Sequence, residues 1–187
     1  YVKKAIPDFD LPESVPFDKA LAAGAKLSLE SPGLELDDLA FLQYTGGTTG
    51  VAKGEMLTQR NHVANMLQSR AWMIPAGVGQ DTEIVITALP LYHIFSLQGN
   101  CLTVMSQGGL NVLITDPRDF EGFAKEIATH PFNLFTGVNT MFASLMHTPS
   151  FDDVDFSHLR VCIGGGTAVQ PAVAARVTQV HDRSRTI

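Results

Sequence analysis

Residues 83–114, EIVITALPLYHIFSLQGNCLTVMSQGGLNVLI, decide the fold. The runs Ile84–Ile86 and Val112–Ile114 are apolar at every position, as expected of strands that are covered on both faces. Between them, Ser96–Gln107 has helical periodicity and predicts a helix. Buried strands that alternate with helices indicate a parallel sheet with helices packed on it.

The same alternation extends to both sides of this stretch. Further strands are expected at Leu39–Tyr44, Asn133–Gly137 and Arg160–Ile163, and the two already described extend over Glu83–Ala88 and Asn111–Ile114. Further helices are expected at Thr58–Ala71, Phe120–Thr129, Thr140–Met146 and Gln170–Val180. The pattern predicts an α/β fold with an open, doubly wound, mostly parallel sheet and helices on both faces. Such sheets bind ligands at the carboxyl ends of their strands. The loops expected to bind ligands therefore follow Tyr44, Ala88, Gly137 and Ile163.

The first part of the chain has a different composition. Residues 1–37 are rich in Pro, Gly and acidic side chains, with one short helical pattern at Phe17–Ala25, so they are interpreted as a connecting segment. Residues 38–187 form the predicted α/β domain. Because the chain begins at Tyr1 without a Met and ends at Ile187 just after a helical run, we expect an internal fragment of a longer protein.

Composition excludes several classes of protein. The 187 residues are 45% hydrophobic and 17% charged, which is typical of a globular domain with a core. The formal net charge of −6 gives no general attraction to nucleic acid. Cys101 and Cys162 form no C-x-x-C pair, which argues against a disulfide framework or a zinc site and favours a reduced, cytoplasmic compartment. The apolar stretch Ile84–Leu97 is too short to span a bilayer.

The most informative loop is residues 44–54, YTGGTTGVAKG, between a predicted strand and a predicted helix. Glycines let the backbone approach an anion, threonine hydroxyls add donors, and Lys53 supplies a positive charge for a polyphosphate. A flexible turn is the alternative interpretation, which the density of such residues disfavours. A Walker A loop needs Gly before the lysine and Ser or Thr after it, but Ala52 and Gly54 stand there. A phosphate-binding loop of another kind is therefore predicted.

Other strand ends carry weaker signals. His93 lies in PLYHIFS after the second strand, and a lone histidine there is more often structural than catalytic. Met and Phe in FTGVNTMF, residues 135–142, indicate core by composition alone. The turn in VCIGGGTAV, residues 161–169, lacks the last glycine of a dinucleotide fingerprint, because Val169 stands there. Cys162 is interpreted as a small buried hydrophobe rather than a nucleophile.

The remaining histidines show no metal-ligand spacing and are interpreted as surface or capping residues. They are His62, His130, His147, His158 and His181. Arg60 and Arg70 are interpreted as solvated charges of the first long helix.

Residues 38–65, DLAFLQYTGGTTGVAKGEMLTQRNHVAN, resemble the AMP-binding signature of acyl-CoA synthetases in the adenylate-forming superfamily, in its long-chain fatty-acid:CoA ligase form. The resemblance extends over nearly the whole chain, to about Arg176. It implies that the glycine loop closes over the β- and γ-phosphates of ATP. The residues that match this role are Thr45, Gly46, Gly47, Thr48, Thr49, Gly50 and Lys53. Glu55 departs from the family, which commonly has a small residue there.

The resemblance also implies roles at the other strand ends. His93 would shape the acyl pocket rather than transfer a proton, because a carboxylate is already ionised at neutral pH. Val138, Thr140 and Met141 would line the acyl tunnel. The turn of Gly164, Gly165 and Gly166 would run against the adenine and the acyl carbonyl. No catalytic side chain or metal ligand is assigned within this chain.

The implied activity is fatty-acid:CoA ligation with ATP, Mg²⁺ and CoA, through an acyl-adenylate and pyrophosphate. Family members continue with a Tyr-Gly-x-Thr-Glu motif that binds magnesium, a ribose-binding aspartate, a hinge and a mobile domain with the adenylation lysine. None of these occurs here, and residues 180–187, VHDRSRTI, do not resemble the family continuation. We therefore expect this polypeptide by itself to be inactive.

Two alternatives stay open. One is an adenylate-forming ligase for another carboxylic acid, which the depth of the tunnel would distinguish. The other is a non-catalytic α/β domain whose glycine loop binds some other anion. The expected partners are small molecules and not nucleic acid; peripheral association with the inner face of the membrane suits a fatty-acid ligase, but no residue here supports it. Acyl chain length and oligomeric state have no signal in the sequence.

Overall fold

The computed structural model describes residues 10–45, 52–79 and 82–184. The chain divides into two units, Tyr1–Glu35 and Leu36–Ile187. In the first unit the expected short helix is present as α1, Phe17–Gly24, which has no buried residue. Every other described element belongs to the second unit.

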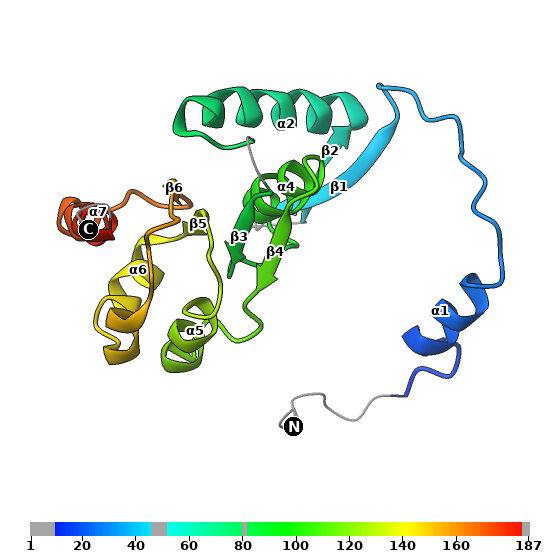
Figure 1. Cartoon of the computed structure of the whole chain (residues 1–187). Helices are drawn as coiled ribbons and strands as arrows, with labels where there is room; N and C mark the ends of the chain where they lie inside the picture. The colour runs from blue at the N-terminus through cyan, green and yellow to red at the C-terminus, as the bar shows by residue number, and fades with distance from the viewer. Residues whose placement is uncertain (1–9, 46–51, 80–81, 185–187) are drawn as a thin grey trace. The chain divides into compact units, whose positions relative to one another are not determined.

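The second unit contains a parallel sheet whose described strands follow the order β4-β3-β5-β6 (Figure 1). These strands are β3 (Ile84–Thr87), β4 (Leu110–Leu113), β5 (Leu134–Gly137) and β6 (Val161–Gly164). Ile86 of β3 pairs with Val112 on one side and with Phe135 on the other. The chain thus adds β4 on one side of β3 and β5 on the other, and the predicted doubly wound parallel sheet is confirmed for these strands.

Helices cover both faces of this sheet, as the alternation of apolar side chains requires. Ile86 and Phe135 face a core with α5 (Phe120–Ile127), α6 (Asn139–Leu145) and α7 (Pro171–Ser184). Val85 and Leu134 face the opposite core with α2 (Gln59–Met73) and α4 (Thr103–Met105). Short 3₁₀ helices lie at η1 (Ile74–Ala76) and η3 (Pro149–Asp153). None of the described helices has the length and apolar character needed to cross a bilayer.

The strand expected at Leu39–Tyr44 forms, but its predicted place in the parallel sheet is wrong. It is β1, Leu39–Thr45, and it pairs antiparallel with β2, Lys53–Thr58, in a separate two-stranded sheet. Hairpin pairing needs only a short connection, whereas a parallel neighbour needs a crossover. The glycine loop therefore lies between two strands, not between a strand and a helix.

The helix expected at Ser96–Gln107 is also divided. It consists of α3 (Ile94–Ser96), a π-helix η2 (Leu97–Leu102) and α4. π-helical turns are uncommon and frequently occur at functional sites.

The π-helix carries Asn100, which is fully buried. Its Nδ2 lies 2.7 Å from Thr136 Oγ1 and 3.2 Å from Thr87 Oγ1. Thr87 in turn donates to Asn111 Oδ1 at 2.7 Å. This network ties the carboxyl ends of β3 and β5 to the crossover between β3 and β4.

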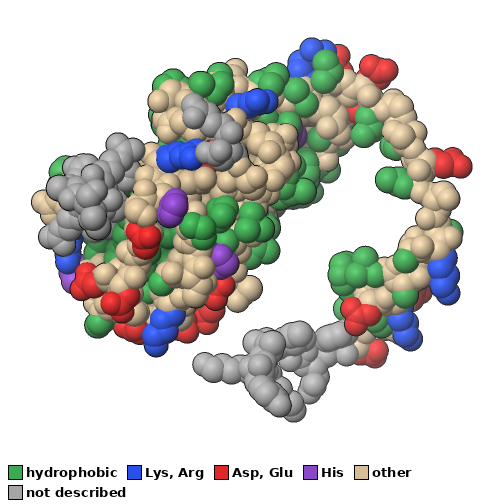
Figure 2. Space-filling model, viewed as in Figure 1, with side chains coloured by type: hydrophobic (Ala, Val, Ile, Leu, Met, Phe, Trp, Pro, Cys, Tyr) green, Lys and Arg blue, Asp and Glu red, His purple; other side chains and the backbone are tan. Residues whose placement is uncertain are grey.

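Phenylalanine rings dominate the core beneath α5 and α6. Phe135 makes edge-to-face contacts with Phe123, Phe132 and Phe142 at centroid distances of 6.0, 5.9 and 5.4 Å. Burying each such ring stabilises the fold by about 1.5–3 kcal/mol. Outside this core, acidic side chains gather over α5 and η3 (Figure 2), in keeping with the negative net charge.

Candidate functional site

The carboxyl ends of β5 and β6 meet at one edge of the sheet. Gly137, the last residue of β5, pairs with Gly164, the last residue of β6. Gly165 donates its N–H to the carbonyl of Gly137 at 3.0 Å. The loops expected to carry function after these strands are thus brought together, as in other open α/β sheets.

A residue other than glycine at positions 164–166, in the turn that ends β6, would force this turn or its neighbours to rearrange. A Cβ on Gly165 would lie 2.7 Å from Phe95 Cε1, and one on Gly164 would lie 2.4 Å from Val169 Cγ2. Gly166 has a φ of +77°, in the left-handed region that side chains disfavour. The structure therefore brings the predicted glycine turn against Phe95, which follows β3 in the chain.

His93 lies next to Phe95 and caps its helix. The Nδ1 of His93 accepts a hydrogen bond from the backbone N–H of Phe95 at 3.2 Å, and the side chain is exposed. This geometry fixes the start of α3 and the direction of Phe95.

The expected tunnel residues lie in different environments. Val138 precedes α6, and its Cγ1 would lie 3.4 Å from a Cβ at Gly166. Thr140 is exposed. Met141 is only 7% exposed and belongs to the core beneath α6.

The predicted phosphate loop connects β1 to β2 in the sequence. Its residues 46–51, which include Gly46, Gly47, Thr48, Thr49 and Gly50, lie outside the described residues. At the base, Thr45 of β1 pairs with Lys53 of β2, and the Lys53 side chain is exposed. Next to it, the Tyr44 ring packs against Gly54, where a Cβ would contact the ring at 3.4 Å.

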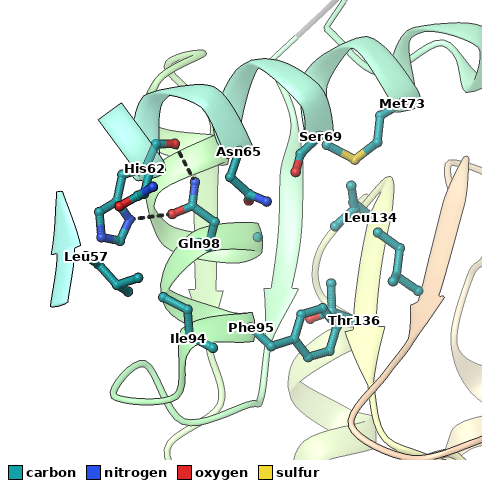
Figure 3. A pocket seen from close by; sticks show the side chains of 13 residues that line it. Leu57, His62, Asn65, Ser69, Met73, Ile94, Phe95, Gln98, Leu134 and Thr136 are labelled. Carbon is teal, nitrogen blue, oxygen red and sulfur yellow. Dashed lines mark hydrogen bonds between the residues drawn. The ribbon is translucent and has the colours of Figure 1, made fainter. Parts of the chain in front are cut away.

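A cavity of about 540 Å³ lies between α2, the segment of α3 and η2, and the sheet (Figure 3). Its lining residues are Leu57, Asn61, His62, Asn65, Ser69, Met73, Ile94, Phe95, Gln98, Gly99, Leu134, Thr136 and Ile163. Asn65, Ser69 and Met73 point from α2 toward Leu134 and Thr136 of β5. The cavity thus has a polar side on the helix and an apolar floor on the strand and α3.

This cavity was not predicted from the sequence. Of the residues expected at the acyl pocket, none lines it, although Ile94 and Phe95 follow His93 directly. The available signal was the spacing of Asn61, Asn65 and Ser69, which recur every four residues and therefore share one helix face.

His62 was expected at the surface, and this expectation is wrong, because its side chain is only 5% exposed. Its Nδ1 lies 2.7 Å from Gln98 Oε1, and Gln98 Nε2 donates to the His62 carbonyl at 3.0 Å. The Phe41 ring packs edge-on against the imidazole at 4.9 Å. Figure 3 shows this pair at the end of the cavity beside Leu57.

Arg60, expected as a solvated charge, forms an exposed ion pair with Asp37. Its Nε lies 2.8 Å from Asp37 Oδ1. The hydrogen bond and then the positive charge of Arg60 lower the pKa of Asp37. The pair joins the start of α2 to the segment before β1.

Residues 4–186 match the family described as AMP-binding enzyme. The chain belongs to the AMP-binding enzyme family.

The relatives of this AMP-binding enzyme chain include several long-chain-fatty-acid–CoA ligases. It is 50% identical to the long-chain-fatty-acid–CoA ligase of Escherichia coli O6:H1 over 176 residues, which cover 94% of this chain and 31% of the relative. The chain therefore spans about a third of the length of the curated relatives that it resembles.

Two solved structures share the fold. The ATP-bound RpMatB-BxBclM chimera B1 superposes with a TM-score of 0.67 at 25% identity, covering 86% of this chain and 30% of the other. O-succinylbenzoate coenzyme A synthetase from Bacillus subtilis, in complex with AMP, gives a TM-score of 0.62 at 25% identity, covering 78% of this chain and 28% of the other. The α/β architecture is thus that of adenylate-forming ligases.

The AMP-binding chain offers no ready metal site in the part that the structure describes. Among the side chains that the structure describes, no three of His, Cys, Asp or Glu gather closely enough to hold an ion. Burial raises the pKa of the Cys162 thiol to about 12, which keeps it neutral and unreactive at physiological pH. Neither metal chemistry nor thiol chemistry is therefore assigned to these side chains.

Proposed function

We propose that this chain is part of a long-chain fatty-acid–CoA ligase, which activates a fatty acid with ATP and transfers the acyl group to CoA. The observation that carries the proposal is the 50% identity to the Escherichia coli ligase over 94% of this chain. The cavity beneath α2 supports it, because about 540 Å³ lies in the range of small-molecule sites and the floor is apolar.

The hairpin loop is proposed to bind ATP. Thr45, Gly46–Gly50 and Lys53 would hold the β- and γ-phosphates while the fatty-acid carboxylate attacks the α-phosphorus. One carboxylate oxygen forms a bond to phosphorus as the bond to pyrophosphate breaks. Backbone N–H groups and the Lys53 ammonium would stabilise the negative charge that develops on the pyrophosphate leaving group. The CoA thiolate then attacks the acyl carbonyl and releases AMP.

The strand ends are proposed to position the acyl group. The bare backbone of Gly164–Gly166 would face the adenine and the carbonyl, and Val138 packs on this turn. His93 would act through its cap on α3, which directs Phe95. The fatty-acyl chain would occupy the cavity over Leu134. Thr140 and Met141 do not line this cavity and remain proposed members of the tunnel only by the family resemblance.

Other groups that the ligase reaction needs are proposed to lie in parts of the whole protein outside this chain. Mg²⁺ would accompany the nucleotide, but the described residues hold no ligand set for it, so its ligands are expected elsewhere in the whole protein. Because the chain spans 31% of its relative, we expect it to lack ligase activity by itself. The free thiols Cys101 and Cys162 favour a cytoplasmic location.

A ligase for another carboxylic acid is the second candidate. The polar face of Asn61, Asn65 and Ser69 favours it, because a plain alkyl chain would remove water from these groups without replacing their hydrogen bonds.

The test is CoA-thioester formation by the whole protein with ATP, CoA and palmitate, octanoate or benzoate. The ligase proposal predicts the highest kcat/KM with palmitate and no product when ATP is omitted. Preference for benzoate would support the second candidate. Nucleotide binding without product from any acid would leave only an anion-binding domain.

A further inference from the structure

The His62–Gln98 contact joins two parts of the fold that the sequence separates by 36 positions. Gln98 donates through Nε2 to the His62 carbonyl, so its Oε1 is the atom that faces the imidazole. An amide oxygen only accepts, and the proton of the His62 ring therefore lies on Nδ1. The two residues thus exchange two hydrogen bonds, and both side chains are less than a tenth exposed.

On one side, His62 is fixed to the hairpin that carries the phosphate loop. β2 ends at Thr58, whose side chain caps α2 by accepting from the Asn61 N–H at 3.3 Å. His62 lies on the first turns of this helix, and Phe41 of β1 packs on its ring. The Thr58 cap, strand β2 and the Phe41 ring leave the imidazole little freedom to move. Its position therefore follows that of the hairpin.

On the other side, Gln98 is itself part of the wall of the cavity beneath α2. It lies in η2, directly after α3, and Thr103 Oγ1 donates to its carbonyl at 2.7 Å. Ile94 and Phe95 precede it and line the same cavity. A second link runs in parallel, because Gln43 of β1 donates to the Tyr92 carbonyl at 3.1 Å.

We propose that His62 and Gln98 are positioning residues that set the register between the β1–β2 hairpin and the cavity beneath α2. The inference rests on the proposed function, because it concerns the alignment of the ATP α-phosphate with the fatty-acid carboxylate. A misplacement of about 1 Å between reacting groups can lower a rate by about a hundredfold without weakening the binding of either reactant. The pair therefore acts on kcat rather than on KM.

The experiment compares three variants of the whole protein in fatty-acid-dependent ATP–pyrophosphate exchange. Gln98→Met keeps the side-chain length and removes both hydrogen bonds. His62→Leu removes the Nδ1 donor, whereas His62→Asn keeps a donor at that position, since the amide nitrogen of Asn lies where Nδ1 does. Gln68→Ala is the matched control, an exposed polar residue of α2 that does not line the cavity.

We expect Gln98→Met and His62→Leu to lower kcat by about 10- to 100-fold, with the KM values for ATP and fatty acid changed less than about 3-fold. His62→Asn recovers most of the rate, and Gln68→Ala matches the unmodified protein. Rates are compared well below each variant's Tm, so that a loss of folding does not contribute. If His62→Leu does not fold, Gln98→Met measures the same loss.

An unchanged kcat in Gln98→Met, or a change confined to the KM for fatty acid, would overturn the positioning role while leaving the ligase proposal intact. Failure of His62→Asn to recover the rate would also count against it, because the Nδ1 donor would then not be the group that matters. Absence of exchange by the unmodified protein would overturn the proposed function itself, and this inference with it.

Discussion

The Cα of Gly165 lies against the ring of Phe95, so that a Cβ at Gly165 would come within 2.7 Å of Phe95 Cε1. We predict that Gly165→Ala lowers the free energy of unfolding by about 1–3 kcal/mol, because the added methyl group would overlap the Phe95 ring, which must shift to make room. Urea denaturation measures the change. Gly99→Ala is the control, since its Cβ would meet the same ring at 3.9 Å, an ordinary contact.

The close contact between Gly165 and Phe95 also predicts how substitutions at these two positions combine. Gly165→Ala combined with Phe95→Leu should recover part of the lost stability, because the smaller side chain makes room for the methyl group. Stability in Gly165→Ala equal to that of the unmodified chain would show that the turn and the ring are not in contact.

The buried network around Asn100 also predicts a loss of stability. Asn100→Leu removes both hydrogen bonds of the buried Thr136 hydroxyl, at a cost of about 1–3 kcal/mol, whereas the Thr87 hydroxyl keeps its bond to Asn111 Oδ1. The midpoint of urea unfolding should fall accordingly. Asn65→Ala is the control, an exposed residue of α2. Equal midpoints for the two variants would contradict the network.

Cys162 is predicted to resist alkylation in the folded protein. Burial raises its pKa from 9.0 to about 12, so at pH 8, below both values, its thiolate is about a thousandfold rarer in the folded than in the unfolded state. Iodoacetamide labelling, quantified by peptide mass spectrometry with and without urea, measures the ratio. Because the folded state holds this proton more tightly, its stabilising effect is complete below pH 9 and is lost as pH rises toward 12. Similar labelling rates in the two states would show that the pKa of Cys162 is not raised in the folded protein.

The parallel strands could be predicted because the residues within each strand indicate by themselves that it is a buried strand. Ile84–Ile86 and Leu134–Phe135 are apolar on both faces, and such runs fit only a covered sheet. β2 was missed because Lys53, Gly54 and Glu55 have low strand propensity, and their pairing with β1 depends on a contact outside the segment itself.

The site was predicted only in part for a similar reason. The glycines after β6 were identifiable because the turn requires them, as the φ of +77° at Gly166 shows. The His62–Gln98 pair was not identifiable, because a histidine on a largely polar helix gives no sign of its burial. Its environment is created by Phe41 and by the π-helix, and the sequence carries no pattern for either.

Lys53 is predicted to act on the nucleotide and not on the fold. Its side chain is exposed at the base of the hairpin, so Lys53→Ala should leave Tm within about 1 °C. The loss of a charged hydrogen bond to phosphate should raise the KM for ATP of the whole protein by about 10- to 100-fold, with little change in the KM for fatty acid. Lys125→Ala, an exposed lysine on α5, is the matched control. An unchanged KM for ATP would remove Lys53 from the phosphate site.

Fatty-acid-dependent ATP–pyrophosphate exchange by the whole protein, across short, medium and long acids and with this chain assayed beside it, is the decisive measurement of the ligase assignment. We expect exchange that is greatest with long acids and absent from this chain by itself. No exchange by the whole protein with any acid would contradict the ligase assignment and favour an anion-binding domain instead.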